Sequence, residues 1–302
     1  MDKRISNFDQ EASVRRYVMQ DGEQKGIEVI DCDNGKTRFL LNVNKACDVM
    51  QLYYEGQNVS FVSKNGFNQR KMPFASKFEG GMVYTCGLDS VGDREGYEVH
   101  GSLHSAPARV LSARCDEQGI YVEAEIKDTA LFGKNLKLIR RFFTAIGSDS
   151  VQMKDTLVNE GYGEEDYALL YHVNLGYPFI GEGTRIEGDV VRSFARTAWA
   201  KERENEYNTL TNPVDNEQET CYFLTLNSPQ VTVINKDGKR FTLSYSGETL
   251  PCFVLWKSMA SGDYAVGLEP STTVLDDQFS YKKIAPSQSV DFWLNITIDK
   301  QQ

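Results

Sequence analysis

The sequence lacks the patterns that mark several large classes of protein. It holds three histidines among 302 residues, and its six cysteines include no CxxC pair. No cluster of lysines and arginines offsets the net charge of -10, which argues against a nucleic acid or a membrane surface as partner. No apolar run approaches the roughly 18 residues of a membrane-spanning helix, and the opening stretch, MDKRISNFDQEASVRR, has no apolar centre like that of a signal peptide. We therefore expect a cytoplasmic protein with neither nucleic-acid nor membrane partners, whose scattered cysteines are small buried side chains.

The composition is that of an ordinary folded protein. Hydrophobic residues make up 40% and charged residues 25% of the chain, which excludes wholesale disorder. The length suits one large domain or two ordinary ones, but no repeat, low-complexity segment or Pro/Ser-rich linker divides the chain. We expect a single domain over residues 1–302, with residues 1–30 forming an N-terminal arm or a short helix packed on it.

Segments that predict β-strands fill most of the chain. Short runs rich in Val, Ile, Thr, Tyr and Phe are separated by Gly, Asn, Asp and Pro. In residues 120–127, apolar and polar side chains alternate, which is the pattern of a half-buried strand. The expected strands cover residues 27–31, 37–43, 48–54, 58–63, 80–86, 107–115, 119–127, 136–145, 150–158, 167–174, 219–227, 230–236, 240–246, 252–256, 263–269 and 290–298. Since helical periodicity is best only over residues 194–204, the pattern predicts an all-β fold, a large antiparallel β-sandwich.

All three histidines lie where an expected strand runs into a loop, and functional side chains often gather at such places. His100 and His104 are four residues apart, a spacing that would offer two metal ligands on a helix. Gly101 and Pro107 disfavour a helix there, so the pattern does not favour a metal site. From the residue types alone, each of these histidines and His172 is either a satisfied, partly buried imidazole or part of a site.

Two further segments contain features that suggest a functional site. Glu269 stands in an apolar strand directly before Pro270. A carboxylate in that position is either paired within the structure or faces a cleft with a raised pKa, and both interpretations stay open. The polar, acidic stretch 201–219 is the longest irregular region, and we interpret it as a surface excursion near a binding site.

Several motifs stand in a fixed order along the chain. They are Phe78-Glu79-Gly80-Gly81 with Thr85-Cys86-Gly87-Leu88, then His100-Gly101 leading to Pro107-Ala108, then Tyr171-His172-Val173-Asn174-Leu175-Gly176-Tyr177-Pro178, then Gly267-Leu268-Glu269-Pro270. In this order they resemble the aldose 1-epimerase-like family, and most of all a large bacterial branch of it long described only as a domain of unknown function. The resemblance spans about residues 35–300 and implies the galactose mutarotase-like supersandwich, a large twisted antiparallel β-sandwich with few short helices.

The resemblance also implies roles for three residues. His172 matches the general acid of mutarotases, Glu269 matches the general base, and His100 matches a histidine that contacts the sugar. The family needs no metal and no organic cofactor, so we expect none. The residues that we expect to bind substrate beside these three are His104, Asn174, Tyr177, Trp256 and Lys257. The family's sugar-holding arginine and aspartate are left open among Arg70, Arg94, Asp189, Asp215 and others.

Such a set of residues suits the exchange of sugar anomers. Ring opening takes a proton from the anomeric hydroxyl and gives one to the ring oxygen, which a base and an acid placed around these atoms can do. We expect Glu269 to start as a carboxylate and His172 as an imidazolium, because each charge favours the other. The prediction is an aldose 1-epimerase-like isomerase whose partner is a small carbohydrate. The alternatives are a non-catalytic carbohydrate-binding or regulatory protein on the same fold, and an accessory domain of a lyase or hydrolase.

Overall fold

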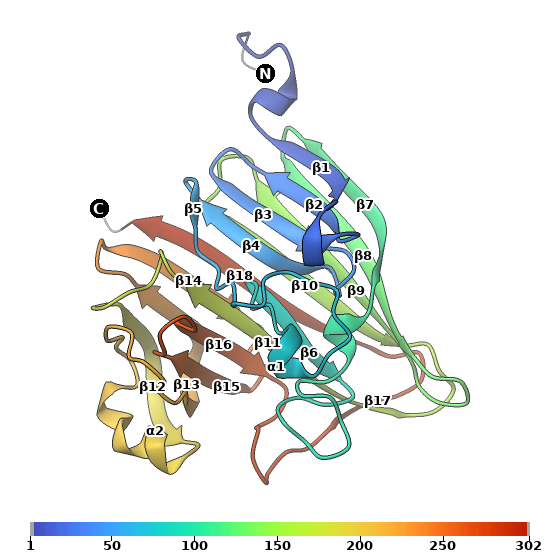
Figure 1. Ribbon diagram of the computed structural model, residues 1–302. Helices are drawn as coiled ribbons and strands as arrows, with labels where there is room; N and C mark the ends of the chain where they lie inside the picture. The colour runs from blue at the N-terminus through green and yellow to red at the C-terminus, as the bar shows by residue number, and fades with distance from the viewer. Residues whose placement is uncertain (1–2, 301–302) are drawn as a thin grey trace.

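The computed structural model describes residues 3–300, and β-strands make up most of them (Figure 1). The strands are β1 (Ser13–Val18), β2 (Glu28–Asp33), β3 (Thr37–Asn42), β4 (Asp48–Tyr54), β5 (Gln57–Asn58), β6 (Val83–Leu88), β7 (Ala108–Asp116), β8 (Gly119–Thr129), β9 (Asn135–Ala145), β10 (Ser150–Asn159), β11 (Glu165–Gly176), β12 (Arg185–Ala195), β13 (Thr220–Ile234), β14 (Lys239–Tyr245), β15 (Cys252–Ser258), β16 (Ala265–Ser271), β17 (Lys282–Ile284) and β18 (Ser289–Lys300). The helical segments are α1 (Phe74–Lys77), α2 (Ala198–Glu202) and the 3-10 turns η1 (Phe8–Gln10), η2 (Gly22–Gln24), η3 (Leu103–Ser105) and η4 (Glu204–Glu206).

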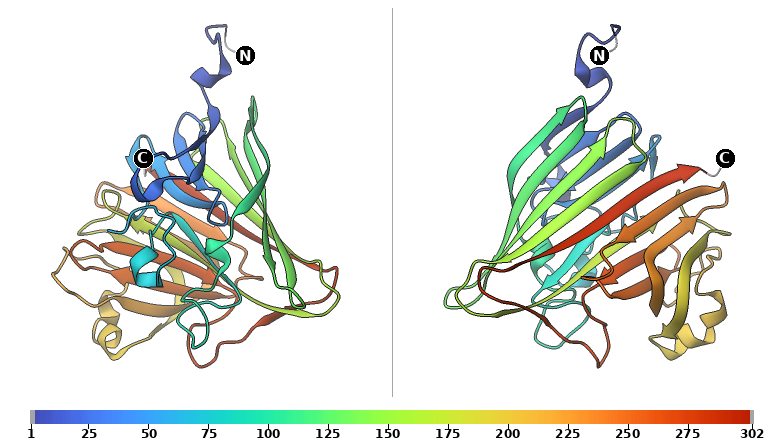
Figure 2. Two further views of the ribbon diagram at one scale, coloured as in Figure 1. Left: turned by 45° about the vertical axis from the view of Figure 1, so that its right-hand side comes forward. Right: turned by 180° about the vertical axis from the view of Figure 1, so that it is seen from behind.

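The strands form two antiparallel sheets. The smaller sheet has the order β1-β2-β3-β4-β5. The larger one has thirteen strands in the order β17-β11-β16-β15-β13-β14-β18-β10-β9-β8-β7, with β12 added to β13 and β6 added to β11. The smaller sheet packs on the part of the larger sheet that contains β7 to β10 (Figures 1 and 2), and Phe39 of β3 meets Phe142 of β9 in the core between them. The predicted all-β fold, a large antiparallel β-sandwich with few short helices, is thus confirmed.

The large sheet continues beyond the smaller one. Its strands β6, β11, β16, β15 and β13 are not covered by a second full sheet, and α1 lies in front of β6 and β11 (Figure 1). Phe78, which follows α1, contacts the His172 ring on β11 with centroids 6.0 Å apart. Because loops and a short helix cover this face instead of a regular sheet, it has room for a cavity.

A buried cluster of charged side chains joins the two sheets. The Arg140 guanidinium on β9 is 0% exposed and forms ion pairs with Asp155 of β10, at 2.6 Å, and with Asp48 of β4. The Tyr171 hydroxyl donates to Asp155 at 2.7 Å, and His104 Nδ1 lies 2.9 Å from an Asp48 oxygen. Burial by itself raises the pKa of Asp48, but Arg140 and His104 outweigh it and hold that pKa below its usual value. Ion pairs and hydrogen bonds between oppositely charged, buried side chains therefore link the smaller sheet to the larger one.

The sequence pattern misses three strands, β1, β12 and β17. Most side chains of β1 and β12 are exposed, so these strands have little apolar alternation to detect. Where an N-terminal arm or short helix is expected over residues 1–30, the described part contains two 3-10 turns and the strands β1 and β2; residues 1–2 lie outside it. The two strands expected at 219–227 and 230–236 are one long strand, β13.

No helix within residues 3–300 combines the length and the apolar character needed to cross a membrane.

Candidate active site

His172 and Glu269 face each other across two neighbouring strands. The pairing of β11 with β16 sets Val173 opposite Leu268, and the same register puts His172 opposite Glu269. Directly opposed residues of an antiparallel pair share one face of the sheet. His172 Nε2 lies 3.1 Å from Glu269 Oε1. Two side chains from distant parts of the sequence thereby form a direct acid–base contact.

Gly267 leaves the space that this contact occupies. It precedes Glu269 by two residues on β16 and therefore points to the same face. A Cβ at this position would lie 2.8 Å from His172 Cε1 and 2.9 Å from Glu269 Oε1. Both separations are shorter than real Cβ contacts, so any larger residue here would displace at least one member of the acid–base pair.

A loop with unusual backbone conformation brings His100 to the same place. His100 has φ 65°, in the left-handed region that residues other than glycine seldom adopt, and Gly101 has φ 79°. The His100 amide donates to the Gly92 carbonyl at 2.8 Å, and its own carbonyl accepts from the Gly87 amide at 3.0 Å. These bonds fix the loop so that the His100 ring meets the His172 ring edge-on, with centroids 5.6 Å apart.

The three residues line a cavity of about 690 Å³. Trp256 on β15 forms one wall, with its ring centroid 5.4 Å from that of His172, and Phe78 also lines the cavity. The Trp256 indole N–H donates to Glu219 at 2.7 Å, which holds the ring in place. A concave site with aromatic walls and a few convergent polar groups is typical of small-molecule binding.

Burial controls the protonation of the site. It raises the pKa of Glu269 to about 8, helped by the Glu219 charge, and it lowers the pKa of His172 to about 3, helped by His100. It likewise lowers the pKa of His100 to about 4, with Arg196 adding to the effect. At neutral pH the shared proton of the pair therefore rests on Glu269, opposite to the charges that the sequence led us to expect. The reason is that a buried site disfavours both ionised forms.

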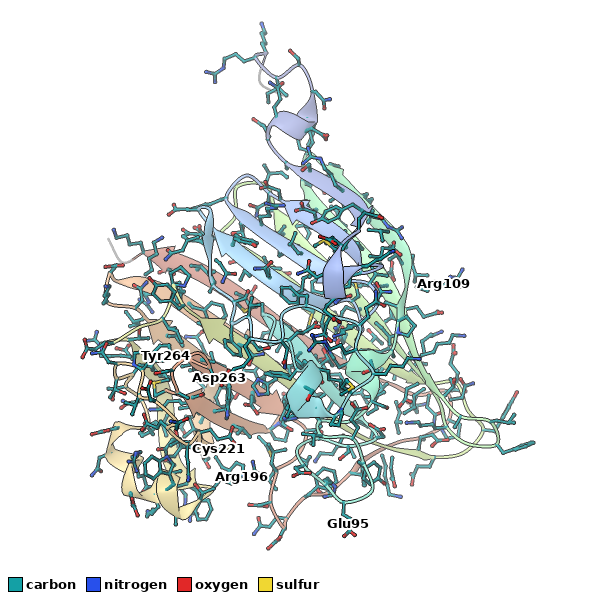
Figure 3. All side chains as sticks on the ribbon, in the orientation of Figure 1. Glu95, Arg109, Arg196, Cys221, Asp263 and Tyr264 are labelled. Atoms are coloured by element: carbon teal, nitrogen blue, oxygen red, sulfur yellow. The ribbon has the colours of Figure 1, made fainter. Side chains whose placement is uncertain are left out.

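Sequence reasoning missed Arg196, which follows β12 and lines the cavity. Its backbone N–H donates to the Cys221 carbonyl at 2.9 Å, and Figure 3 shows the two residues beside each other. The Arg196 charge lowers the pKa of Glu269 and so opposes the effect of burial. Because the strand before Arg196 is mostly exposed, no apolar pattern marks this residue in the sequence.

The arginines considered from the sequence lie elsewhere. Arg70 pairs with Glu23, at 3.1 Å, and the Arg94 guanidinium lies 3.6 Å from the centre of the Phe279 ring. Neither lines the cavity. The carboxylates that do line it besides Glu269 are Asp93, Glu217, Glu219 and Asp263; the expected candidates Asp189 and Asp215 are not among them. Glu217 and Glu219 belong to the acidic stretch that we interpreted as lying near a site.

Of the five residues expected to bind substrate, only Trp256 lines this cavity. His104 lies in the buried charge cluster, and its ring stacks on Tyr84 with centroids 3.6 Å apart. Asn174 is fully buried and donates to the carbonyls of Gly81 and His172.

Lys257 and Tyr177 are placed outside the cavity for simple geometric reasons. Neighbouring residues of a strand point to opposite faces, so Lys257 points away from the face that presents Trp256. Its ammonium group donates to the carbonyls of Glu206 and Thr209, at 2.7 and 2.8 Å. Tyr177 follows the end of β11, is 77% exposed and lines a different cavity.

The described residues contain no group of three or more His, Cys, Asp or Glu side chains that could hold a metal ion. His100 and His104, which have metal-ligand spacing in sequence, point to different surroundings: the cavity and the buried charge cluster. The site consists of titratable side chains, aromatic rings and one arginine.

Comparison with protein families matches residues 24–289 to a family described as a domain of unknown function, DUF4432. No curated protein matches the chain. The family match covers both histidines of the candidate site and Glu269.

Many solved structures share the fold. A protein from Klebsiella pneumoniae, provisionally named aldose 1-epimerase, has a TM-score of 0.87 at 21% identity, over 97% of this chain and 86% of its own. A galactose mutarotase-like protein from Clostridium acetobutylicum has a TM-score of 0.69 at 14% identity, over 97% of this chain and 100% of its own. A Salmonella typhimurium protein provisionally named mutarotase has a TM-score of 0.69 at 13% identity, over 95% and 94%. At these identities the comparisons establish a common fold.

Proposed function

Because the chain belongs to the DUF4432 family, a domain of unknown function, and has the galactose mutarotase-like fold, we propose that it is an aldose 1-epimerase-like enzyme. It would interconvert the anomers of a free sugar or sugar derivative in the cytoplasm. The observation that carries the proposal is the 3.1 Å contact of His172 with Glu269 in a cavity that His100 also lines.

The pair holds the one proton that the reaction needs. Burial favours Glu269 as its holder, and its transfer to His172 Nε2 across the short contact gives a carboxylate and an imidazolium. Glu269 then takes the proton of the anomeric hydroxyl while His172 gives its proton to the ring oxygen, and the bond between C1 and that oxygen breaks. After rotation about C1–C2, the two groups transfer protons in the reverse sense, and the ring closes to the other anomer.

The remaining cavity residues fit the needs of a sugar. His100 is neutral at pH 7, because its pKa is lowered to about 4, so its ring can donate one hydrogen bond and accept another. Trp256 offers a flat apolar surface to the carbon face of a pyranose ring. Arg196 is the residue that we propose for holding a sugar oxygen in place of the arginine that sequence reasoning could not assign.

The test is anomer exchange by the purified protein. Freshly dissolved α-glucose, α-galactose and other aldoses are followed by polarimetry, with exchange between anomers measured by NMR. The proposal predicts acceleration over the spontaneous rate for at least one sugar. Sugar binding by calorimetry without any acceleration would favour the non-catalytic carbohydrate-binding protein instead.

Gly267→Ala should impair exchange strongly. The added methyl group would stand 2.8 Å from His172 and 2.9 Å from Glu269, so the acid–base pair must move apart. Misplacing catalytic groups by about 1 Å lowers rates on the order of 10²-fold, and we expect a loss of kcat/KM of that size. Gly163→Ala is the matched control, because no atom lies within 4 Å of its added methyl group. Equal activity of the two variants would contradict the role given to Gly267.

Glu269 should make stability depend on pH in a defined window. Its pKa is 4.5 before burial and about 8 in the folded protein. Between these values the unfolded chain loses a proton that the folded chain keeps, so rising pH favours unfolding. The free energy of unfolding of the wild type, relative to Glu269→Gln, should therefore fall from pH 4.5 to about 8 and then level off. Urea unfolding at a series of pH values measures it, and a difference that stays constant over this window would refute the raised pKa.

A further inference from the structure

A second cavity, of about 770 Å³, lies beside the candidate active site. Phe61 lines both cavities. The loop between β15 and β16 also serves both, since Asp263 lines the first cavity and Tyr264 the second (Figure 3). The two cavities are therefore neighbours that share a wall.

Strand β11 leads from one cavity to the other. His172 belongs to the first cavity, and Tyr177, directly after the last residue of β11, belongs to the second. At about 3.3 Å per residue, five residues of strand span about 16 Å. That is longer than a single pyranose ring and suits a chain of two or more sugar units.

The second cavity has side chains suited to a carbohydrate. Tyr177 is 77% exposed and leaves its ring free, as an aromatic platform for the apolar face of a sugar requires. Asn58 lines the cavity, and its side-chain N–H donates to the Ser60 carbonyl at 2.8 Å. Asn212 and Asp237 add an amide and a carboxylate to the lining. Flat aromatic surface next to amides and carboxylates matches a ligand that is apolar on its ring face and rich in hydroxyls at its edge.

An exposed ion pair connects the loops at the boundary of the two cavities. Lys64 Nζ lies 2.7 Å from Asp263 Oδ2, and the side chains are 66% and 42% exposed. The pair joins the segment after Phe61 to the loop that carries Tyr264. Because exposed ion pairs add little to stability, a ligand that crosses the boundary can displace this one.

We propose that the two cavities form one extended site for a reducing oligosaccharide, or for a sugar carrying a glycosyl substituent. Its free anomeric end lies at His172 and Glu269, and its second unit stacks on Tyr177. The inference rests on the proposed function for the reacting end, and it adds the substrate class: a glycosylated aldose in preference to a lone monosaccharide.

The experiment compares monosaccharides with reducing disaccharides. Anomer exchange is measured for glucose and galactose, and for maltose, cellobiose and lactose, with the wild type, Tyr177→Ala and Tyr177→Phe. The wild type should exchange at least one disaccharide with a kcat/KM about tenfold above that for the monosaccharides, which corresponds to about 1.4 kcal/mol of added binding. Tyr177→Ala should remove this preference by raising KM for the disaccharide, and it should leave monosaccharide exchange unchanged. Tyr177→Phe should keep the disaccharide preference. Tyr162→Ala is the matched control, because Tyr162 is fully exposed and lines neither cavity.

The outcomes separate the two proposals. Monosaccharide exchange without a disaccharide preference, or a preference that survives Tyr177→Ala, overturns the extended site and leaves the proposed function intact. If no sugar is exchanged, the proposed function fails. Binding of the same sugars, measured by calorimetry, then tests the extended site by itself. Disaccharide binding that is tighter than monosaccharide binding and is lost in Tyr177→Ala would support the extended site, and equal or absent binding would overturn it.

Discussion

Glu269→Gln is expected to lower kcat/KM for anomer exchange by about 10² to 10⁴-fold, the contribution typical of a general acid or base. Glutamine keeps the size of the side chain and can still donate a hydrogen bond to His172. It can neither take the proton of the anomeric hydroxyl nor return it, so ring opening loses its base and ring closure loses its acid. The measurement is exchange between anomers by NMR, on whichever sugar the wild type exchanges.

Folding cannot explain such a loss. Glutamine is neutral, like the protonated carboxyl group that burial favours at this position, so the variant should be at least as stable as the wild type at pH 7. The control is Glu187→Gln on the exposed strand β12, where the side chain is 55% exposed and the activity should not change. Retention of wild-type exchange by a folded Glu269→Gln protein would remove Glu269 from the mechanism.

Arg140→Met is expected to destabilise the fold by about 3–5 kcal/mol, because it leaves buried carboxylates without their counter-charge. Asp155 and Asp48 are 0% and 3% exposed, and both pair with this guanidinium. The neighbouring residue offers a matched control. Arg141 points to the other side of β9 and is 45% exposed, so Arg141→Met should change stability by no more than about 1 kcal/mol.

Urea denaturation of both variants and the wild type measures the two free energies of unfolding. If Arg140→Met does not fold at all, Arg140→Lys keeps the positive charge and should recover a large part of the stability. Equal losses in Arg140→Met and Arg141→Met would show that the buried cluster contributes no more than an exposed ion pair.

Much of the fold is predictable from the sequence, because most strands have one buried face. Apolar alternation marks β8, where Ile120, Val122, Ala124 and Ile126 are all buried. It fails for β12, whose side chains mostly face solvent. Sheet order and register are not readable in this way, since they depend on contacts between residues far apart in the chain.

The candidate site, like the fold, was predictable from the sequence only in part. The family resemblance selects His100, His172 and Glu269, and all three line one cavity. Local reasoning could not predict which side chains stand beside them. Trp256 and Lys257 are adjacent in sequence but point to opposite faces of β15. Arg196 reaches the cavity through the pairing of β12 with β13, which no local pattern reveals. The charge state was also beyond the sequence, because it follows from the depth of burial.

Within residues 3–300, loops and α1, and no second sheet, cover the face of β11 and β16. This has a consequence for how a ligand can be found. Phe61 and His100 come from loops that close over strands much later in the chain, so the complete cavity exists only once the whole sandwich has formed. A ligand of this cavity therefore binds the native state and not the unfolded chain. Such a ligand adds stability that grows with the logarithm of its concentration, about 2.7 kcal/mol at a hundredfold excess over Kd, and so raises the midpoint of thermal unfolding. The sugar can thus be identified by the heat resistance it confers, whether or not its chemistry is known.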